Sequence, residues 1–168
     1  MSRKLGLEEA LDIAMEAELK AQAFYAQAAA EIEDPRGRDL LGRLAAFEQH
    51  HYQKLAELLS SLQKDGRFIN YASSTLAQFA PWTGGGEASG VLLEELKNEA
   101  GILGKAIENE KAAGEQYRAL KEETDDPAGQ AMFQQLADEE QMHQRILEDE
   151  FFSLSNQGVW GWSGMYGE

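Results

Sequence analysis

The sequence predicts an all-α protein, a four-helix bundle made of two duplicated helical hairpins that a long crossover joins. Apolar residues recur at helical spacing through four stretches of the 168-residue chain, and this period predicts helices that each bury one face. The second half of the chain repeats residues of the first half at a constant offset of 92 positions, which indicates a duplicated unit. A glycine-rich stretch without a steady period separates the two halves, and it predicts a connection.

The first hairpin begins with a helix predicted from about Leu7 to Glu33, where apolar residues and alanines recur at helical steps along one face. Asp34 and Pro35 follow. An aspartate caps the free backbone N–H groups of a helix start, and proline is favoured in the first turn, so this pair predicts the start of the second helix. That helix continues to about Lys64.

The crossover is predicted at about residues 65–89, where glycines and a proline interrupt the helical period. About two dozen residues in extended form easily span a helix of about 40 Å, so this segment can return along the whole bundle. A third helix is predicted to start near Gly90 and to end at the segment TDDPAG. The fourth helix runs from Pro127 to about Phe152.

The closing segment is a tail at 153–168, rich in glycine and aromatic residues and without a helical period. We expect Trp160 and Trp162 in this tail to cover one end of the bundle or a dimer interface. The chain therefore reads as a single domain over 1–168, with the bundle at about 7–152.

The duplication spans a helix, a turn and a second helix. At the offset of 92 the same residue types recur, and the matched pairs are Tyr25 and Tyr117, Pro35 and Pro127, Gly37 and Gly129, Leu44 and Leu136, Leu55 and Leu147. A shared offset across all these elements predicts two hairpins related by a pseudo-twofold axis.

Composition excludes several function classes. The chain has 15 Lys and Arg against 30 Asp and Glu, a formal charge of −15, and no cluster of basic residues, so nucleic acid and anionic membranes are not expected as partners. No apolar run approaches the roughly 18 residues of a membrane span, and the acidic N-terminus does not resemble a signal peptide. We therefore expect a cytoplasmic protein. Because there is no cysteine, a metal would need Asp, Glu and His ligands.

Polar residues interrupt the apolar stripe of the second helix. Glu48 and His51 stand between Leu44 and Leu55 at steps of four, three and four, on the face that the leucines bury. Each hairpin carries one such Glu on its first helix and a Glu-x-x-His on its second. The full set is Glu18, Glu48, His51, Glu110, Glu140 and His143.

This set predicts a centre for two metal ions. Four carboxylates in an apolar core are costly to ionise by themselves, whereas two divalent cations balance their charge while the histidines stay neutral. Oxygen and imidazole ligands without a thiolate suit iron or manganese and differ from a structural zinc site.

The chain resembles the rubrerythrin branch of the ferritin-like superfamily. The resembling segments are EAELKAQAFYAQ and IENEKAAGEQYRAL, each with a Glu seven residues before a Tyr, and FEQHHYQKL and EEQMHQRIL, each with Glu-x-x-His and a Leu four residues later. The resemblance covers about residues 7–152. It implies a ferritin-like bundle with a di-iron centre, in which manganese or zinc can replace iron, held by the six residues above. It also implies that Tyr25 and Tyr117 hydrogen-bond to the ligands, although each can equally be a core aromatic whose hydroxyl needs a partner.

The resemblance further implies reduction of hydrogen peroxide to water. Many rubrerythrins carry a rubredoxin domain with Cys-x-x-Cys motifs, and this chain has no cysteine, so the electrons would come from a separate donor protein. Many also place an additional Glu one turn after the third-helix ligand, where this chain has Ala113. Two alternatives stay open: a ferroxidase that oxidises Fe(II) with oxygen, and a scaffold that binds metal only for stability. We also expect a homodimer.

Overall fold

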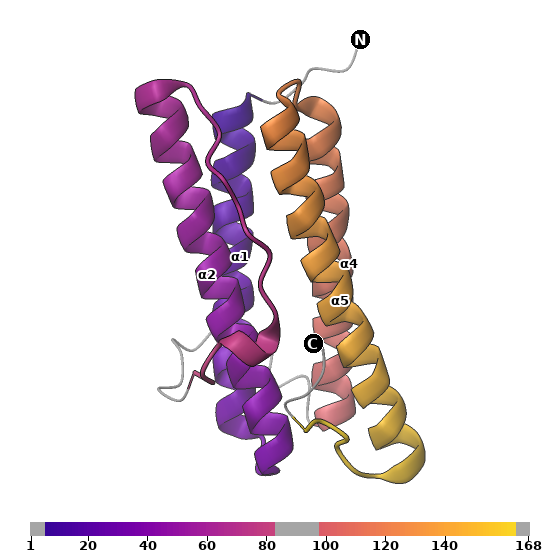
Figure 1. Ribbon diagram of the computed structural model, residues 1–168. Helices are drawn as coiled ribbons and strands as arrows, with labels where there is room; N and C mark the ends of the chain where they lie inside the picture. The colour runs from indigo at the N-terminus through magenta and orange to yellow at the C-terminus, as the bar shows by residue number, and fades with distance from the viewer. Residues whose placement is uncertain (1–5, 83–97, 164–168) are drawn as a thin grey trace.

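The structure, a computed structural model, describes residues 6–82 and 98–163. Four α-helices and one 3₁₀ turn make up the described part of the chain (Figure 1). The elements are α1 (Leu7–Glu31), α2 (Pro35–Asp65), η1 (Leu76–Gln78), α4 (Glu99–Glu123) and α5 (Pro127–Gln157). No strand occurs within those two ranges, and the prediction of an all-α four-helix bundle is confirmed.

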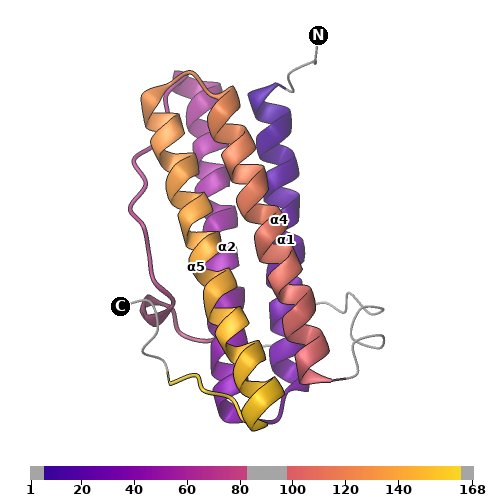
Figure 2. The same cartoon turned by 90° about the vertical axis from the view of Figure 1, so that its right-hand side faces the viewer.

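The helices form two hairpins. Helix α1 packs along α2 and α4 packs along α5; the two pairs lie side by side in Figure 1, and the pair of α4 and α5 stands in front of the other pair in Figure 2. Within the described ranges, no helix is both long and apolar enough to cross a membrane.

The duplication is visible in how the second helix of each hairpin begins and ends. The Asp34 carboxylate accepts a hydrogen bond from the backbone N–H of Arg36 at 2.9 Å, and Asp126 caps α5 in the same way. Both helices end at a glycine in the left-handed conformation, Gly66 with φ 66° and Gly158 with φ 72°. Glycine is favoured there because it has no Cβ to clash.

The buried apolar residues form two clusters, one toward each end of the bundle. One cluster includes Phe24, Leu44 and Leu147, and the other includes Leu11 and Leu136. Along every helix, the polar residues predicted to bind metal fall between the members of these two clusters. The apolar clusters thus enclose a polar layer at the middle of the bundle.

Each hairpin also closes one end of the other. Phe68, just after α2, lies against Gly129 at the start of α5, and Trp160, just after α5, lies against Gly37 at the start of α2. A Cβ added at Gly37 would lie 2.7 Å from the Trp160 ring, and one at Gly129 would lie 2.5 Å from the Phe68 ring. Phe68 and Trp160 are themselves 92 positions apart, so the repeat includes these contacts.

One predicted boundary was wrong, and another lies outside the described residues. The helix start predicted near Gly90 falls in residues 83–97, which the structure does not describe. The described helix α4 begins at Glu99, where the Asn98 side chain accepts from the backbone N–H of Gly101 and caps the helix. Helix α5 continues to Gln157, five residues beyond Phe152. Nothing in the segment SLSNQ breaks a helix, and Leu154 packs against the core, so the helix ends only at the glycine that follows.

The tail after α5 covers the bundle end, as predicted. Trp160 and Trp162 are each 1% exposed. Their indole N–H groups donate to Glu99 Oε2 and Asp39 Oδ2, both at 2.7 Å. These bonds join the tail to the N-terminal parts of α4 and α2. Residues 164–168 are outside the described part.

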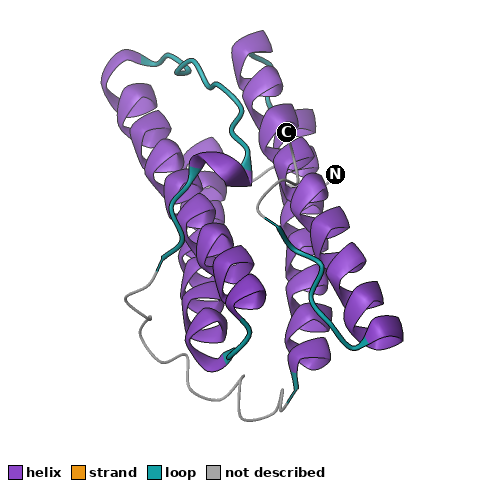
Figure 3. Cartoon of the chain, turned by 60° about the horizontal axis from the view of Figure 1, so that its bottom comes forward, coloured by secondary structure: helices purple, strands orange, loops and turns teal. Residues whose placement is uncertain are grey.

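The segment after α2 returns along the bundle toward η1, in front of the helices in Figure 1 and as the teal loop in Figure 3. Arg43 on α2 holds it near η1 through a 2.8 Å hydrogen bond to the Phe79 carbonyl. This segment brings Tyr71 and Ser74 against α5, beside the polar layer.

Candidate metal centre

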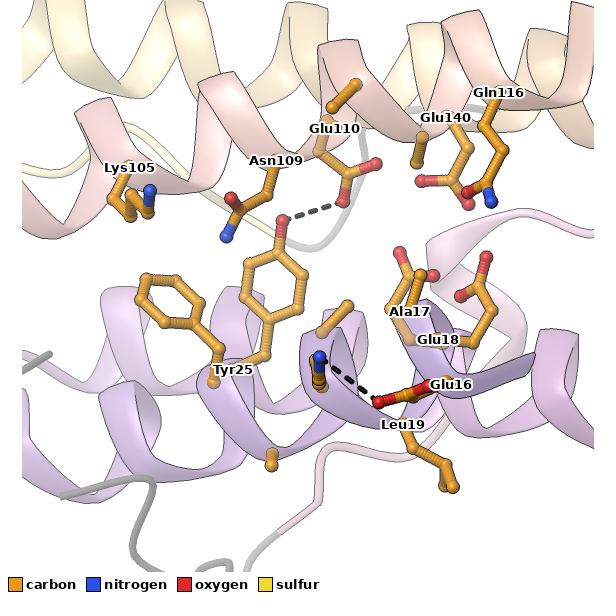
Figure 4. A pocket seen from close by; sticks show the side chains of 17 residues that line it. Glu16, Ala17, Glu18, Leu19, Tyr25, Lys105, Asn109, Glu110, Gln116 and Glu140 are labelled. Carbon is orange, nitrogen blue, oxygen red and sulfur yellow. Dashed lines mark hydrogen bonds and ion pairs between the residues drawn. The ribbon is translucent and has the colours of Figure 1, made fainter. Parts of the chain in front are cut away.

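The structure brings all six predicted ligands together in the middle of the bundle. Glu18 comes from α1, Glu110 from α4, and a Glu-x-x-His pair from each of α2 and α5. Every one of the six is at most 3% exposed. In Figure 4 the carboxylates of Glu18, Glu110 and Glu140 point toward one another from facing helices.

The six residues form two overlapping groups, each of which could hold one metal ion. Glu18, Glu48, His51 and Glu140 make one group, and Glu48, Glu110, Glu140 and His143 make the other. Within each group the potential ligand atoms all lie within 4.8 Å of one another. Glu48 and Glu140 belong to both groups.

The imidazoles present the same nitrogen to the carboxylates. His51 Nδ1 lies 2.8 Å from Glu140 Oε1 and 3.5 Å from Glu48 Oε2. His143 Nδ1 lies 3.4 Å from Glu48 Oε1 and 3.6 Å from Glu110 Oε1. Each Nδ1 therefore faces the space that its group of carboxylates surrounds.

Unsatisfied polar atoms gather at this one place. Seven buried side-chain atoms of the described residues make no hydrogen bond, although some lie in ion-pair contact with one another, as His51 Nδ1 does with Glu140 Oε1 at 2.8 Å. All seven belong to the six predicted ligands. They include both Nδ1 atoms of the histidines and both oxygens of Glu48. Buried polar groups are otherwise almost always paired. Carboxylate oxygens and imidazole nitrogens are donor atoms for iron and manganese, so the chemistry of this cluster fits a pair of such ions.

Two tyrosines hold the carboxylates of the first helix of each hairpin. The Tyr25 hydroxyl on α1 donates to Glu110 Oε1 on α4 at 2.6 Å (Figure 4). The Tyr117 hydroxyl on α4 donates to Glu18 Oε1 on α1. Each bond leaves the other oxygen of its carboxylate unpaired, so the tyrosine fixes the orientation of the group and leaves one oxygen available.

The electrostatics of the metal-free cluster favour bound protons. Burial raises the pKa of the Glu18 and Glu140 carboxyls well above the usual range, and neighbouring carboxylates add to this effect. Burial by itself would lower the pKa of His143, but Glu110 and Glu48 outweigh it and raise that pKa to about 9. In His51, Glu18 and other carboxylates likewise outweigh burial and raise the pKa well above its usual value. The protons partly balance the negative charge of the buried carboxylates.

One buried carboxylate at the cluster was not predicted. Glu139, next to Glu140 on α5, is 6% exposed, and its Oε2 lies 2.8 Å from His51 Nε2. The Tyr71 hydroxyl donates to the same oxygen at 2.6 Å. The residue 92 positions before Glu139 is Phe47, so the repeat gave no signal for it; the only hint was its place directly before the Glu-x-x-His motif.

A cavity reaches the cluster from one side. It has a volume of about 730 Å³ and lies between α1 and α4, with the four predicted carboxylate ligands in its lining. Small side chains such as Ala17, Ala21 and Ala113 form much of the rest. Neither His51 nor His143 is among the lining residues. A small molecule that enters here would meet the carboxylate side of the centre.

The fold and the cluster define a class of protein, the ferritin-like bundles in which two helices each give a Glu and two each give Glu-x-x-His. The family model for rubrerythrin matches residues 1–59 and 101–158. The chain belongs to the rubrerythrin family.

Comparison with individual proteins adds evidence on the fold. No curated protein matches the chain. Among solved structures, a hypothetical protein from Pyrococcus furiosus is similar, with a TM-score of 0.71 and 24% sequence identity over 93% of this chain and 94% of that one. This likeness supports the four-helix architecture.

Proposed function

We propose that the six buried residues bind two iron ions and that the centre reduces hydrogen peroxide to water. The observation that carries the proposal is the gathering of seven buried atoms without a hydrogen bond on those residues alone among the described part of the chain. Family membership supports a carboxylate-bridged iron pair. The ligand set also accepts manganese or zinc as substitutes.

The residues have distinct roles in this proposal. Glu48 and Glu140 belong to both ligand groups and would bridge the ions. Glu18 with His51, and Glu110 with His143, would each bind one ion. Two bound ferrous ions would supply the two electrons that break the O–O bond of peroxide. Tyr25 and Tyr117 hold Glu110 and Glu18 by hydrogen bonds, which would leave the other oxygen of each carboxylate to bind an ion.

The cavity between α1 and α4 is the proposed route for peroxide. Its lining contains both the carboxylates and several alanines, and the short alanine side chains leave room for a small polar molecule. Electrons to return the centre to its reduced state would come from a separate protein, since the chain has no cysteine for a rubredoxin site of its own. A cytoplasmic location and a homodimer remain predictions.

Stopped-flow absorption tests the proposal directly. The protein, loaded anaerobically with two Fe(II) per chain, is mixed in parallel with hydrogen peroxide and with oxygen. We expect fast oxidation by peroxide and slow oxidation by oxygen. The reverse order would contradict the peroxidase.

The second candidate is a ferroxidase, which the presence of Ala113 beside the cluster favours. This residue lines the cavity. Many rubrerythrins carry an additional Glu at this position, and its absence here leaves the centre with the six predicted ligands. Fast oxygen consumption at about two irons per event would support this candidate. A metal-stabilised scaffold would show no turnover with either oxidant, and loss of its metal would lower only its melting temperature.

A further inference from the structure

Glu139 forms a buried contact that only one of the two predicted metal positions has. Its Oε2 lies 2.8 Å from Nε2 of His51, on the side of the imidazole opposite to the ligand cluster. His51 itself is 0% exposed. A carboxylate at this position accepts a hydrogen bond from the Nε2–H of a neutral imidazole, and this tautomer leaves the Nδ1 lone pair free for a cation.

The crossover segment holds Glu139 in this orientation. The Tyr71 hydroxyl donates to both carboxylate oxygens, at 2.6 Å to Oε2. The backbone N–H of Ser74 donates to Oε1 at 3.3 Å. Three donors therefore surround the buried carboxylate, and each of its oxygens has at least one of them. Turning toward the cluster as a further ligand would leave those donors unpaired, which is costly.

The other half of the bundle has no such carboxylate. The residue that corresponds to Glu139 at the offset of 92 is Phe47, which is 0% exposed. Its ring stands edge-on to His143, with the centroids 4.3 Å apart and an angle of 89° between the planes. A phenyl ring packs against an imidazole but cannot replace a carboxylate as an acceptor for its N–H.

The two positions are thus alike in their ligands and different in what supports the histidine. We propose that Glu139 is a positioning residue that makes the two metal positions unequal, so that the Glu18 and His51 position binds a divalent cation more tightly than the Glu110 and His143 position. This inference rests on the proposed metal centre. Carboxylate partners of ligating histidines typically change metal affinity about 10- to 100-fold.

A titration with Co(II) tests the proposal without turnover. Metal-free, full-length protein is titrated anaerobically and followed by the ligand-field absorption of Co(II) and by calorimetry. We expect two ions per chain with separable affinities. In Glu139→Gln, which keeps the shape of the side chain, the tighter ion should bind about 10- to 100-fold more weakly, and the weaker ion should bind as before.

Variants that keep only one of the two metal positions show which position Glu139→Gln weakens. With Glu110→Ala the His51 position remains, and adding Glu139→Gln should weaken its binding by the same factor. With Glu18→Ala the His143 position remains, and adding Glu139→Gln should leave its affinity and its Co(II) spectrum unchanged. A merely structural role for Glu139 would weaken both positions.

The matched control is Glu150→Gln, which removes another buried carboxylate from α5. Glu150 is 1% exposed and accepts from the backbone N–H of Gly161 at 2.8 Å, about two turns beyond His143 along the helix. It should leave both Co(II) affinities unchanged. If Glu139→Gln does not fold, Tyr71→Phe, which keeps the carboxylate, should lower the same affinity by a smaller factor.

The outcomes separate the two claims. Two ions with affinities that Glu139→Gln does not change, or changes equally, would overturn this inference and leave the metal centre standing. Binding of no ion by the unsubstituted protein would overturn the proposed function, and this inference with it.

Discussion

The Tyr25 hydroxyl on α1 donates a 2.6 Å hydrogen bond to Glu110 on α4, and Tyr117 on α4 donates to Glu18 on α1. Each tyrosine therefore joins its own hairpin to a carboxylate of the other hairpin. The two bonds lie across the polar layer, where apolar packing between the hairpins is interrupted. They stabilise the association of the hairpins and orient two proposed metal ligands at the same time.

Removing one of these hydroxyls should destabilise the metal-free protein. Tyr25→Phe leaves both oxygens of Glu110 buried without a partner, since its Oε2 already has none. Such a loss costs about 1–3 kcal/mol of the free energy of unfolding, measured by urea denaturation in the presence of a chelator. Tyr52→Phe, at a half-buried tyrosine of α2, is the control and should change little. Equal effects of the two substitutions would show that the Tyr25 hydroxyl contributes nothing.

The stability of the metal-free protein should fall as the pH rises from about 6.5 to 9. His143 has a folded-state pKa of about 9 against an ordinary histidine value of 6.5, so the folded state holds a proton that the unfolded chain releases. This contribution is complete below about pH 6.5 and is lost as the pH rises through 9. The slope is about 1.4 kcal/mol per pH unit for each such proton. Urea titrations at several pH values check it.

Bound metal should reverse this dependence. Cations bind the deprotonated ligands, so metal affinity rises with pH. The difference in melting temperature between Zn(II)-loaded and metal-free protein should therefore grow from pH 6.5 to 9. A metal-free stability that stays constant or rises over this range would show that the cluster holds no extra protons.

Filling the cavity should slow the reaction with peroxide. Ala113 lines the cavity between α1 and α4, and Ala113→Leu places three more carbon atoms on the proposed path to the carboxylates. We expect a slower oxidation of the Fe(II)-loaded protein by peroxide with an unchanged iron content per chain. Ala119→Leu, at an exposed alanine of the same helix, is the control. Equal rates for the two variants would place the entry route elsewhere.

The ends of the bundle should tolerate no side chain at the two matched glycines. Gly37→Ala and Gly129→Ala each place a Cβ within 3 Å of an aromatic ring, and such overpacking costs about 1–3 kcal/mol. Gly104→Ala on α4 is the control, and it should stabilise the protein instead of destabilising it. Its nearest neighbour would be 3.9 Å away, and alanine in a helix interior is more stable than glycine by about 1 kcal/mol. Thermal denaturation of the three variants decides between these outcomes.

The sequence predicted the features in which the same residue types repeat and missed those in which the residue types differ between the two halves. The offset of 92 predicted both hairpins and the convergence of Glu48 and Glu140 with their histidines, because helical period and duplication place these residues on inward faces. The sequence did not predict the role of Glu139, because the residue at the matched position is Phe47. Its partner Tyr71 comes from a segment that shows no helical period. The contact of Trp160 with Gly37 was not predicted, because Phe68 and Trp160 are different residue types although they occupy matched positions.

Boundaries depended on local chemistry that the pattern did not reveal. The start of α4 is determined by the side chain of Asn98, one of several polar residues that could have capped the helix. The end of α5 is determined by Gly158, and not by the loss of apolar residues after Phe152. At the end of α5 this single capping residue outweighs the hydrophobic period.

The central claim is that two ions share Glu48 and Glu140, and an anaerobic Fe(II) titration of the metal-free protein tests it most directly. We predict two ions per chain, weaker binding of both in Glu48→Ala, and loss of only one in Glu110→Ala, because Glu48 belongs to both ligand groups and Glu110 to one. Binding of one ion or none, or loss of a single ion in Glu48→Ala, would contradict a shared pair of bridging carboxylates.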